Sequence, residues 1–215
     1  MTDIPSMIQK ILILTPPILF AVTVHEVAHG LAAWKLGDPT AKAMGRLTLN
    51  PIKHLDPVGT LVFFITQMIG WAKPVPVNPL NFKDPKRDMI WVALAGPASN
   101  IALAVLSAFV LRSIIGPLSG ASASMGYFIR PLLYMAFVSI QINIGLAIFN
   151  LIPVPPLDGS KVLAGLLPRN LMHHYEALER YGFIILLVLI FTGVTDRIIV
   201  PLINYANRLL IGPII

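Results

Sequence analysis

The residues best suited to chemistry form the pattern H-E-x-x-H at positions 25–29, inside an apolar stretch. His25 and His29 are four residues apart, so on a helix they share a face and can present two imidazoles to one zinc ion. Glu26 lies beside them, where its carboxylate can act as a general base. In a chain with five histidines and three glutamates, random placement gives about 0.002 copies of this pattern. The alternative, two histidines that only satisfy each other in a bundle, would bury three ionisable groups in one turn at membrane depth, which is costly.

A catalytic zinc site usually has three protein ligands, so a third ligand is expected elsewhere in the chain. Because the chain has no cysteine, that ligand must be a histidine or a carboxylate. Asp158 stands out because it follows a proline-rich stretch (residues 150–157), whose rigid extended path can return a carboxylate to the bundle. A turn or N-cap aspartate is the competing interpretation at this position. The full set of candidates is Asp56, Asp158, Asp196, His54, His173 and His174.

Composition indicates the elements that must hold such a site. Of the 215 residues, 56% are hydrophobic and 12% are charged, against about 25% charged in a typical soluble domain. The net charge of +6 does not indicate nucleic-acid binding, because the basic residues lie in short segments between apolar runs and form no basic helix face. The composition favours a multi-pass membrane protein.

The apolar segments predict the membrane topology. A spanning helix needs ~20 residues, which the first, third and fourth segments have, and the fifth reaches with its flanks. The second has only fourteen residues and lies between two clusters of basic residues, so we expect it to be re-entrant, with both clusters in the cytoplasm. The last is either an interfacial helix or a further span. In order, the segments are Met7–Trp34, Val58–Trp71, Met89–Leu111, Pro131–Ile152, Tyr181–Val194 and Ile198–Ile211.

The predicted fold class is therefore an all-α polytopic membrane protein, with four to six transmembrane helices and a re-entrant or strand-like membrane-associated segment. Pro16 and Pro17 predict a kink or a fresh helix start within the first span, which we read as retained rather than as a signal peptide. Residues 1–215 are expected to form a single membrane-embedded domain, with the metal-site core at about 20–165 and C-terminal helices at 180–215.

The stretch at residues 73–79 cannot be helical, because three of its seven residues are proline. An extended segment at membrane depth must be paired or line a cavity. We expect it to hold a substrate backbone by strand addition, with Val75, Val77 and Asn78 as the candidate substrate-binding residues. The competing interpretation is a rigid linker to the third span.

Two motifs of this chain resemble those of a known family. HEVAHG at residues 25–30, together with NLIPVPPLDG at 150–159, is similar to the site-two protease family of intramembrane zinc metalloproteases. The resemblance is to its compact prokaryotic branch, which lacks PDZ and CBS domains. It covers about residues 20–165 and includes the segments at 45–57, 73–79 and 95–100.

The resemblance implies that one zinc ion is held by His25, His29 and Asp158, and that Glu26 is the general base. It implies that Asn150 faces the site and bonds the substrate peptide or the developing oxyanion, although a helix-end asparagine is the competing interpretation. The implied activity is hydrolysis of peptide bonds in transmembrane proteins, as in regulated intramembrane proteolysis. We expect a transmembrane protein substrate and the lipid bilayer as partners, without nucleic acid, in the plasma membrane, with the site toward the cytoplasm. A non-proteolytic transporter or scaffold that retains the metal is the alternative.

Overall fold

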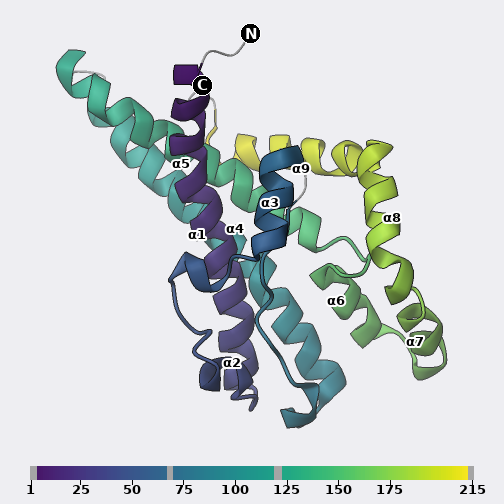
Figure 1. Ribbon diagram of the computed structural model, residues 1–215. Helices are drawn as coiled ribbons and strands as arrows, with labels where there is room; N and C mark the ends of the chain where they lie inside the picture. The colour runs from purple at the N-terminus through teal and green to yellow at the C-terminus, as the bar shows by residue number, and fades with distance from the viewer. Residues whose placement is uncertain (1–3, 67–69, 119–122, 213–215) are drawn as a thin grey trace.

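The computed structural model describes residues 4–66, 70–118 and 123–212. Within these ranges the chain forms helices joined by turns and extended segments, without a β-strand (Figure 1). This element content and the long apolar helices confirm the predicted class, an all-α polytopic membrane protein. In chain order the helices are α1 (Ile4–Lys35), α2 (Thr40–Ala43), η1 (Pro51–Lys53), α3 (Pro57–Thr66), η2 (Pro79–Asn81), α4 (Pro85–Leu118), α5 (Ala123–Asn150), α6 (Asp158–Leu166), α7 (Arg169–Glu176), α8 (Glu179–Phe191) and α9 (Val194–Leu210).

Three helices of the described chain, α1, α4 and α5, are individually long and apolar enough to cross a bilayer. Their apolar stretches have 25, 30 and 22 residues, and at about 1.5 Å per residue even the shortest covers ~30 Å of hydrocarbon. Only 28%, 33% and 22% of the residues in their most apolar windows are buried inside the protein. Most of these apolar side chains therefore face outward, where lipid rather than water must surround them.

The paired prolines do not divide the first span. Helix α1 runs without a break from Ile4 to Lys35, with Pro16 and Pro17 inside it, so the fresh helix start offered as one possibility is not seen. Proline is tolerated in membrane helices because neighbouring groups satisfy the backbone carbonyls that it leaves free. The helix consequently carries residues 25–29 deep into the three-helix bundle.

The three long helices pack against one another, with α4 in contact with both α1 and α5. Small residues such as Ala104 and Ala108 let α4 and α5 approach closely, since association in lipid depends on close van der Waals contact. The apolar cluster built around them consists of Ala104, Ala108, Leu111, Ile140, Ile144 and Ile211. A second cluster of Ala33, Phe82 and Val92 joins the end of α1 to the beginning of α4.

The segment predicted to be re-entrant folds back on itself. Helix α3 has ten residues, about 15 Å of rise, half of what a span needs. An antiparallel bridge pairs Leu55 with Ala72, and the Lys73 N–H donates to the His54 carbonyl over 2.8 Å. The chain on either side of α3 therefore meets, as a re-entrant segment requires; residues 67–69 lie outside the described part.

The extended segment, residues 73–78, is held at both ends. At one end Arg46 donates to the Lys73 carbonyl over 2.8 Å. At the other, Asp38 accepts the Asn78 N–H over 2.8 Å and the Asn81 amide over 2.6 Å. Burial raises the pKa of the Asp38 carboxyl, but hydrogen bonds from Thr40, Asn78 and Asn81 together hold that pKa below its ordinary value. An ionised, buried Asp38 thus ties this segment to the end of α1.

The fourth expected span takes a different form from the prediction. Helix α8 has only 13 residues and ends at Phe191. Gly193, which precedes α9, has a φ of +71°, a left-handed conformation that glycine adopts readily. Helix α9 follows after a bend of 69° and runs from α8 back toward α5, which it contacts (Figure 1). The described chain thus has three spans, or four if α8 and α9 together count as one bent span.

Candidate metal centre

Two imidazoles meet on the inner face of α1. His25 and His29 lie one turn apart, each 7% exposed, with their rings edge to face and the centroids 4.6 Å apart. Their Nε2 atoms are 3.0 Å apart. The helical spacing read from the sequence therefore brings two potential ligand atoms to one point, as expected.

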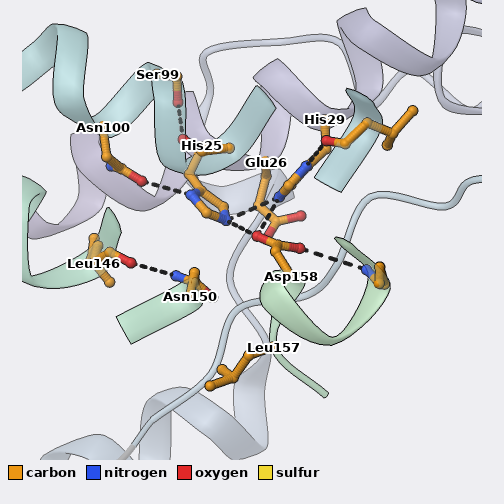
Figure 2. A network of polar contacts seen from close by, with 12 residues as sticks. His25, Glu26, His29, Ser99, Asn100, Leu146, Asn150, Leu157 and Asp158 are labelled. Carbon is orange, nitrogen blue, oxygen red and sulfur yellow. Dashed lines mark hydrogen bonds and ion pairs between the residues drawn. The ribbon is translucent and has the colours of Figure 1, made fainter. Parts of the chain in front are cut away.

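Asp158, at the start of α6, contacts both histidines of α1. Helix α5 ends at Asn150, and a turn containing Pro153, Pro155 and Pro156 leads to Asp158, the first residue of α6. The Asp158 Oδ2 atom lies 3.1 Å from His25 Nε2 and 3.0 Å from His29 Nε2, and the residue is 6% exposed (Figure 2). The proline-rich stretch thus returns a carboxylate to the bundle.

The three converging atoms fit a bound cation. His29 Nδ1 lies 2.7 Å from the Val92 carbonyl, which can only accept, so the ring proton belongs on Nδ1 and Nε2 keeps its lone pair. His25 Nδ1 makes a similar contact of 2.6 Å with Asn100 Oδ1. The Asp158 Oδ2 atom is buried without a hydrogen-bond partner in the described chain. With both ring protons on Nδ1, three lone pairs converge within 3.1 Å of one another, an arrangement that suits a bound cation.

The donor set also matches zinc. Two imidazole nitrogens and one carboxylate oxygen are ligands that zinc prefers, and three protein ligands leave a position open in a catalytic site. Within the described residues, no other cluster of three or more metal-binding side chains brings its ligand atoms this close. Lys161 lies 3.7 Å from the other carboxylate oxygen, Asp158 Oδ1, which leaves Oδ2 for the metal.

Glu26 extends from the same turn of α1 toward the extended segment. Its Oε2 atom accepts the Val75 N–H over 2.8 Å, and Figure 2 shows its side chain beside the cluster of His25, His29 and Asp158. This contact holds one carboxylate oxygen, and no described residue makes such a bond to Oε1. The carboxylate is therefore oriented by the backbone of a segment that is fixed at both ends.

The other candidate ligands lie elsewhere. His54 is buried and bonds the Thr48 carbonyl over 2.8 Å. Asp56 accepts the Gly59 N–H at the start of α3 over 2.8 Å, and Asp196 lies in the first turn of α9. His173 and His174 belong to α7, and their side chains are outside the described part.

The residues predicted to contact substrate differ in their hydrogen-bond partners. The Asn150 amide donates to the Leu146 carbonyl of its own helix over 3.0 Å, beside the metal cluster (Figure 2). The Val75 N–H is engaged by Glu26, and the Asn78 N–H is engaged by Asp38. Val77 packs against the cluster at the end of α1, and no hydrogen bond from its N–H to any described residue is seen. Of the three residues 75, 77 and 78, only Val77 keeps a free donor here.

One face of α4 covers the two histidines, and this face as a whole was not identified from the sequence. Val92, Gly96 and Asn100 are spaced four residues apart, so they share this face. A side chain on Gly96 would overlap both imidazoles, since its Cβ would lie 2.6 Å from His25 Cε1 and 2.5 Å from His29 Cε1. From the sequence alone, Gly96 and Asn100 suit close helix packing, with a bond from Asn100 to the active-site region as the alternative. The signal that was missed is their shared spacing with Val92.

Comparisons with known proteins point to a family of zinc metalloproteases. A family model described as Peptidase family M50 matches residues 111–192. The protein named "Putative zinc metalloprotease YwhC" of Bacillus subtilis is 41% identical over 204 residues, which are 93% of this chain and 89% of that protein. "Putative zinc metalloprotease Rip2" of Mycolicibacterium smegmatis is 28% identical over 183 residues, which are 83% of this chain and 66% of that protein. No solved structure matches this chain.

Proposed function

The chain belongs to peptidase family M50 and is a membrane zinc metalloprotease, and from this premise and its site we propose that it cleaves transmembrane proteins within or near the bilayer. The observation that carries the proposal is the meeting of His25, His29 and Asp158 inside a bundle of apolar helices, with Glu26 beside them. A hydrolytic site enclosed by membrane helices is best placed to act on a chain that is itself in the membrane.

We assign His25, His29 and Asp158 as the residues that hold zinc. When bound, zinc supplies a Lewis acid that polarises a carbonyl group and makes water more acidic. Glu26 then serves as the general base, with Oε1 taking a proton from the attacking water and returning it to the amine that leaves. The Val75 N–H bond to Oε2 keeps the carboxylate in the orientation that this proton transfer needs.

The substrate must be extended when it is cut, because a helix satisfies its own backbone hydrogen bonds and shields its peptide bonds. We assign the extended segment as the edge that receives it, with Val77 offering the first available donor and Val75 acting through Glu26. Asn78 positions this edge through Asp38 and through its side-chain bond to the Leu80 N–H. Asn150, at the end of α5, lies where its amide can turn from Leu146 toward the bound peptide.

We place the site on the cytoplasmic side of the plasma membrane. His25 lies nine residues before Trp34, about 14 Å along the helix from the end that α2 follows. Basic residues lie in α2 and in the chain that leads to α3, and again in the chain that leads to the start of α4, and the positive-inside rule assigns such clusters to the cytoplasm. With this placement, we propose that a single domain, with its core at about residues 20–165, performs regulated intramembrane proteolysis.

The test is replacement of the base. Glu26→Gln keeps the shape of the side chain but cannot take up the proton, so purified protein should lose cleavage of a single-span membrane substrate while it still binds one zinc per chain. The matched control is Glu179→Gln, the same change on α8, which should leave cleavage unchanged. Near wild-type turnover by Glu26→Gln would refute its role. Zinc binding without turnover in the wild type, across a panel of membrane substrates, would favour a scaffold or transporter.

A further inference from the structure

A chain of buried polar side chains leads away from His25 across the bundle. Asn100 on α4 and Asn143 on α5 are 0% and 1% exposed, inside helices that are mainly apolar. Buried amides are costly unless their hydrogen bonds are made. The proton transfer and the metal ligation described above do not involve Asn143, so its place in an apolar helix requires another explanation.

The contacts in this chain are short and continuous. Asn100 Oδ1 lies 2.6 Å from His25 Nδ1 (Figure 2), and this contact is the first in the series. Asn100 Nδ2 lies 2.8 Å from Asn143 Oδ1 and 3.3 Å from the Ala21 carbonyl. Asn143 Nδ2 lies 2.8 Å from the Ser139 carbonyl and 3.2 Å from the Ser139 hydroxyl. The Ser139 and Ser107 hydroxyls are 2.9 Å apart.

The orientation of these amides can be deduced from the groups at the far end. A backbone carbonyl can only accept a hydrogen bond, so the Ser139 carbonyl must face the NH₂ group of Asn143. The Asn143 oxygen then points at Asn100. Two acceptors, this oxygen and the Ala21 carbonyl, thus face one end of the Asn100 amide, and that end must be its NH₂ group.

The tautomer of His25 is determined in the same way. With its NH₂ group committed, Asn100 presents its oxygen to His25, which must therefore carry its proton on Nδ1. His25 Nε2 is left with a lone pair that faces Asp158 and His29. His29 needs no such chain, because the Val92 carbonyl contacts its Nδ1 directly.

We propose that Asn143 is a positioning residue that fixes the metal-binding tautomer of His25 through Asn100. The inference rests on the assignment of His25 as a zinc ligand. Without Asn143, the Asn100 amide is held by the longer Ala21 contact alone and can turn its NH₂ group toward His25. The proton of the ring then moves to Nε2, where it blocks ligation.

The test is a double-mutant cycle read by zinc affinity. Asn143→Leu removes both contacts at similar volume and should weaken zinc binding about tenfold, the lower range for loss of an outer partner. Asn100→Asp places a carboxylate next to His25, and a carboxylate accepts whichever way it turns. In that background Asn143→Leu should have no further effect. Affinity is measured by competition with a chelator in detergent-purified protein.

A packing role for Asn143 predicts a different result, namely an equal loss of affinity in both backgrounds, and that outcome would overturn the proposal. The matched control is Ser107→Ala, because the paired hydroxyls of Ser107 and Ser139 can each donate or accept and so transmit no orientation. We expect its zinc affinity to equal that of the wild type.

A second measurement does not depend on zinc or on the folding of Asn100→Asp. The ¹⁵N shifts of the His25 ring in metal-free protein report which nitrogen carries the proton. The proton should sit on Nδ1 in the wild type and shift toward Nε2 in Asn143→Leu; an unchanged tautomer would overturn the proposal. Wild-type protein that shows the Nδ1 proton but binds no zinc at His25 would contradict the metal assignment instead.

Discussion

Gly96 offers the sharpest test of the metal centre, because the histidines lie directly against it. In Gly96→Ala the new Cβ would lie 2.5 Å from His29 Cε1 and 2.6 Å from His25 Cε1, whereas ordinary contact begins at about 3.4 Å. Both rings sit in the bundle between α1 and α4, so one helix or both rings must move by close to 1 Å. A misplacement of about this size costs on the order of 100-fold in rate, and overpacking of a tight interior typically costs about 1–3 kcal/mol of stability.

The assay compares Gly96→Ala with the same change at Gly145. A Cβ on Gly145 would meet only Ile203 Cδ1, at 3.6 Å, which is an ordinary contact. We expect cleavage of a membrane substrate by Gly96→Ala to fall about 100-fold, with weaker zinc binding, while Gly145→Ala retains both. If Gly96→Ala is folded and keeps wild-type cleavage and zinc affinity, the close packing of α4 on the two imidazoles is not what holds them.

Three further results are expected. Asp158→Ala should lose most of the bound zinc and Asp56→Ala should keep it, as measured by metal analysis of purified protein; the opposite pattern would make Asp56 the third ligand. Cysteines placed singly at Lys53 and Lys83 should both react with impermeant thiol reagents from the cytoplasmic side, and labelling from opposite sides would show that the short segment between them spans. Val77→Pro should lower cleavage about fivefold relative to Val77→Ala, the loss of one hydrogen bond worth about 1 kcal/mol, with zinc content equal in both. Equal cleavage by the two folded variants would reduce residues 73–78 to a linker.

Much of this site could be predicted from the sequence because its key distances are local. The spacing of His25 and His29 is set by the pitch of one helix, and nothing in the tertiary fold has to be known to place them on one face. The short length of the second apolar segment was equally accessible, and ten to fourteen apolar residues cannot cover the hydrocarbon layer. Asp158 was harder, because reasoning from the residues left six candidates, and the family resemblance singled it out.

The partners of the ligands could not be predicted in the same way. Asn100 contacts His25 across 75 positions in the chain, and the Val92 carbonyl contacts His29 across 63. Such pairs depend on the register between α1 and α4, which a pattern within either helix does not fix. The bend at Gly193 was missed for a related reason: Tyr181–Val194 is apolar throughout, and hydropathy does not show where a helix axis turns.

The two anchors of the extended segment also have a thermodynamic consequence. Between Lys73, which is bonded to His54 and Arg46, and Asn78, which is bonded to Asp38, only four residues remain, and Val75 among them is tied to Glu26. Ordering a free stretch of four residues would cost about 4–8 kcal/mol of backbone conformational entropy. Folding of this protein already orders these four residues. A substrate segment that adds to this edge therefore loses only its own conformational entropy. Even a loosely structured substrate segment could therefore bind long enough to be cut.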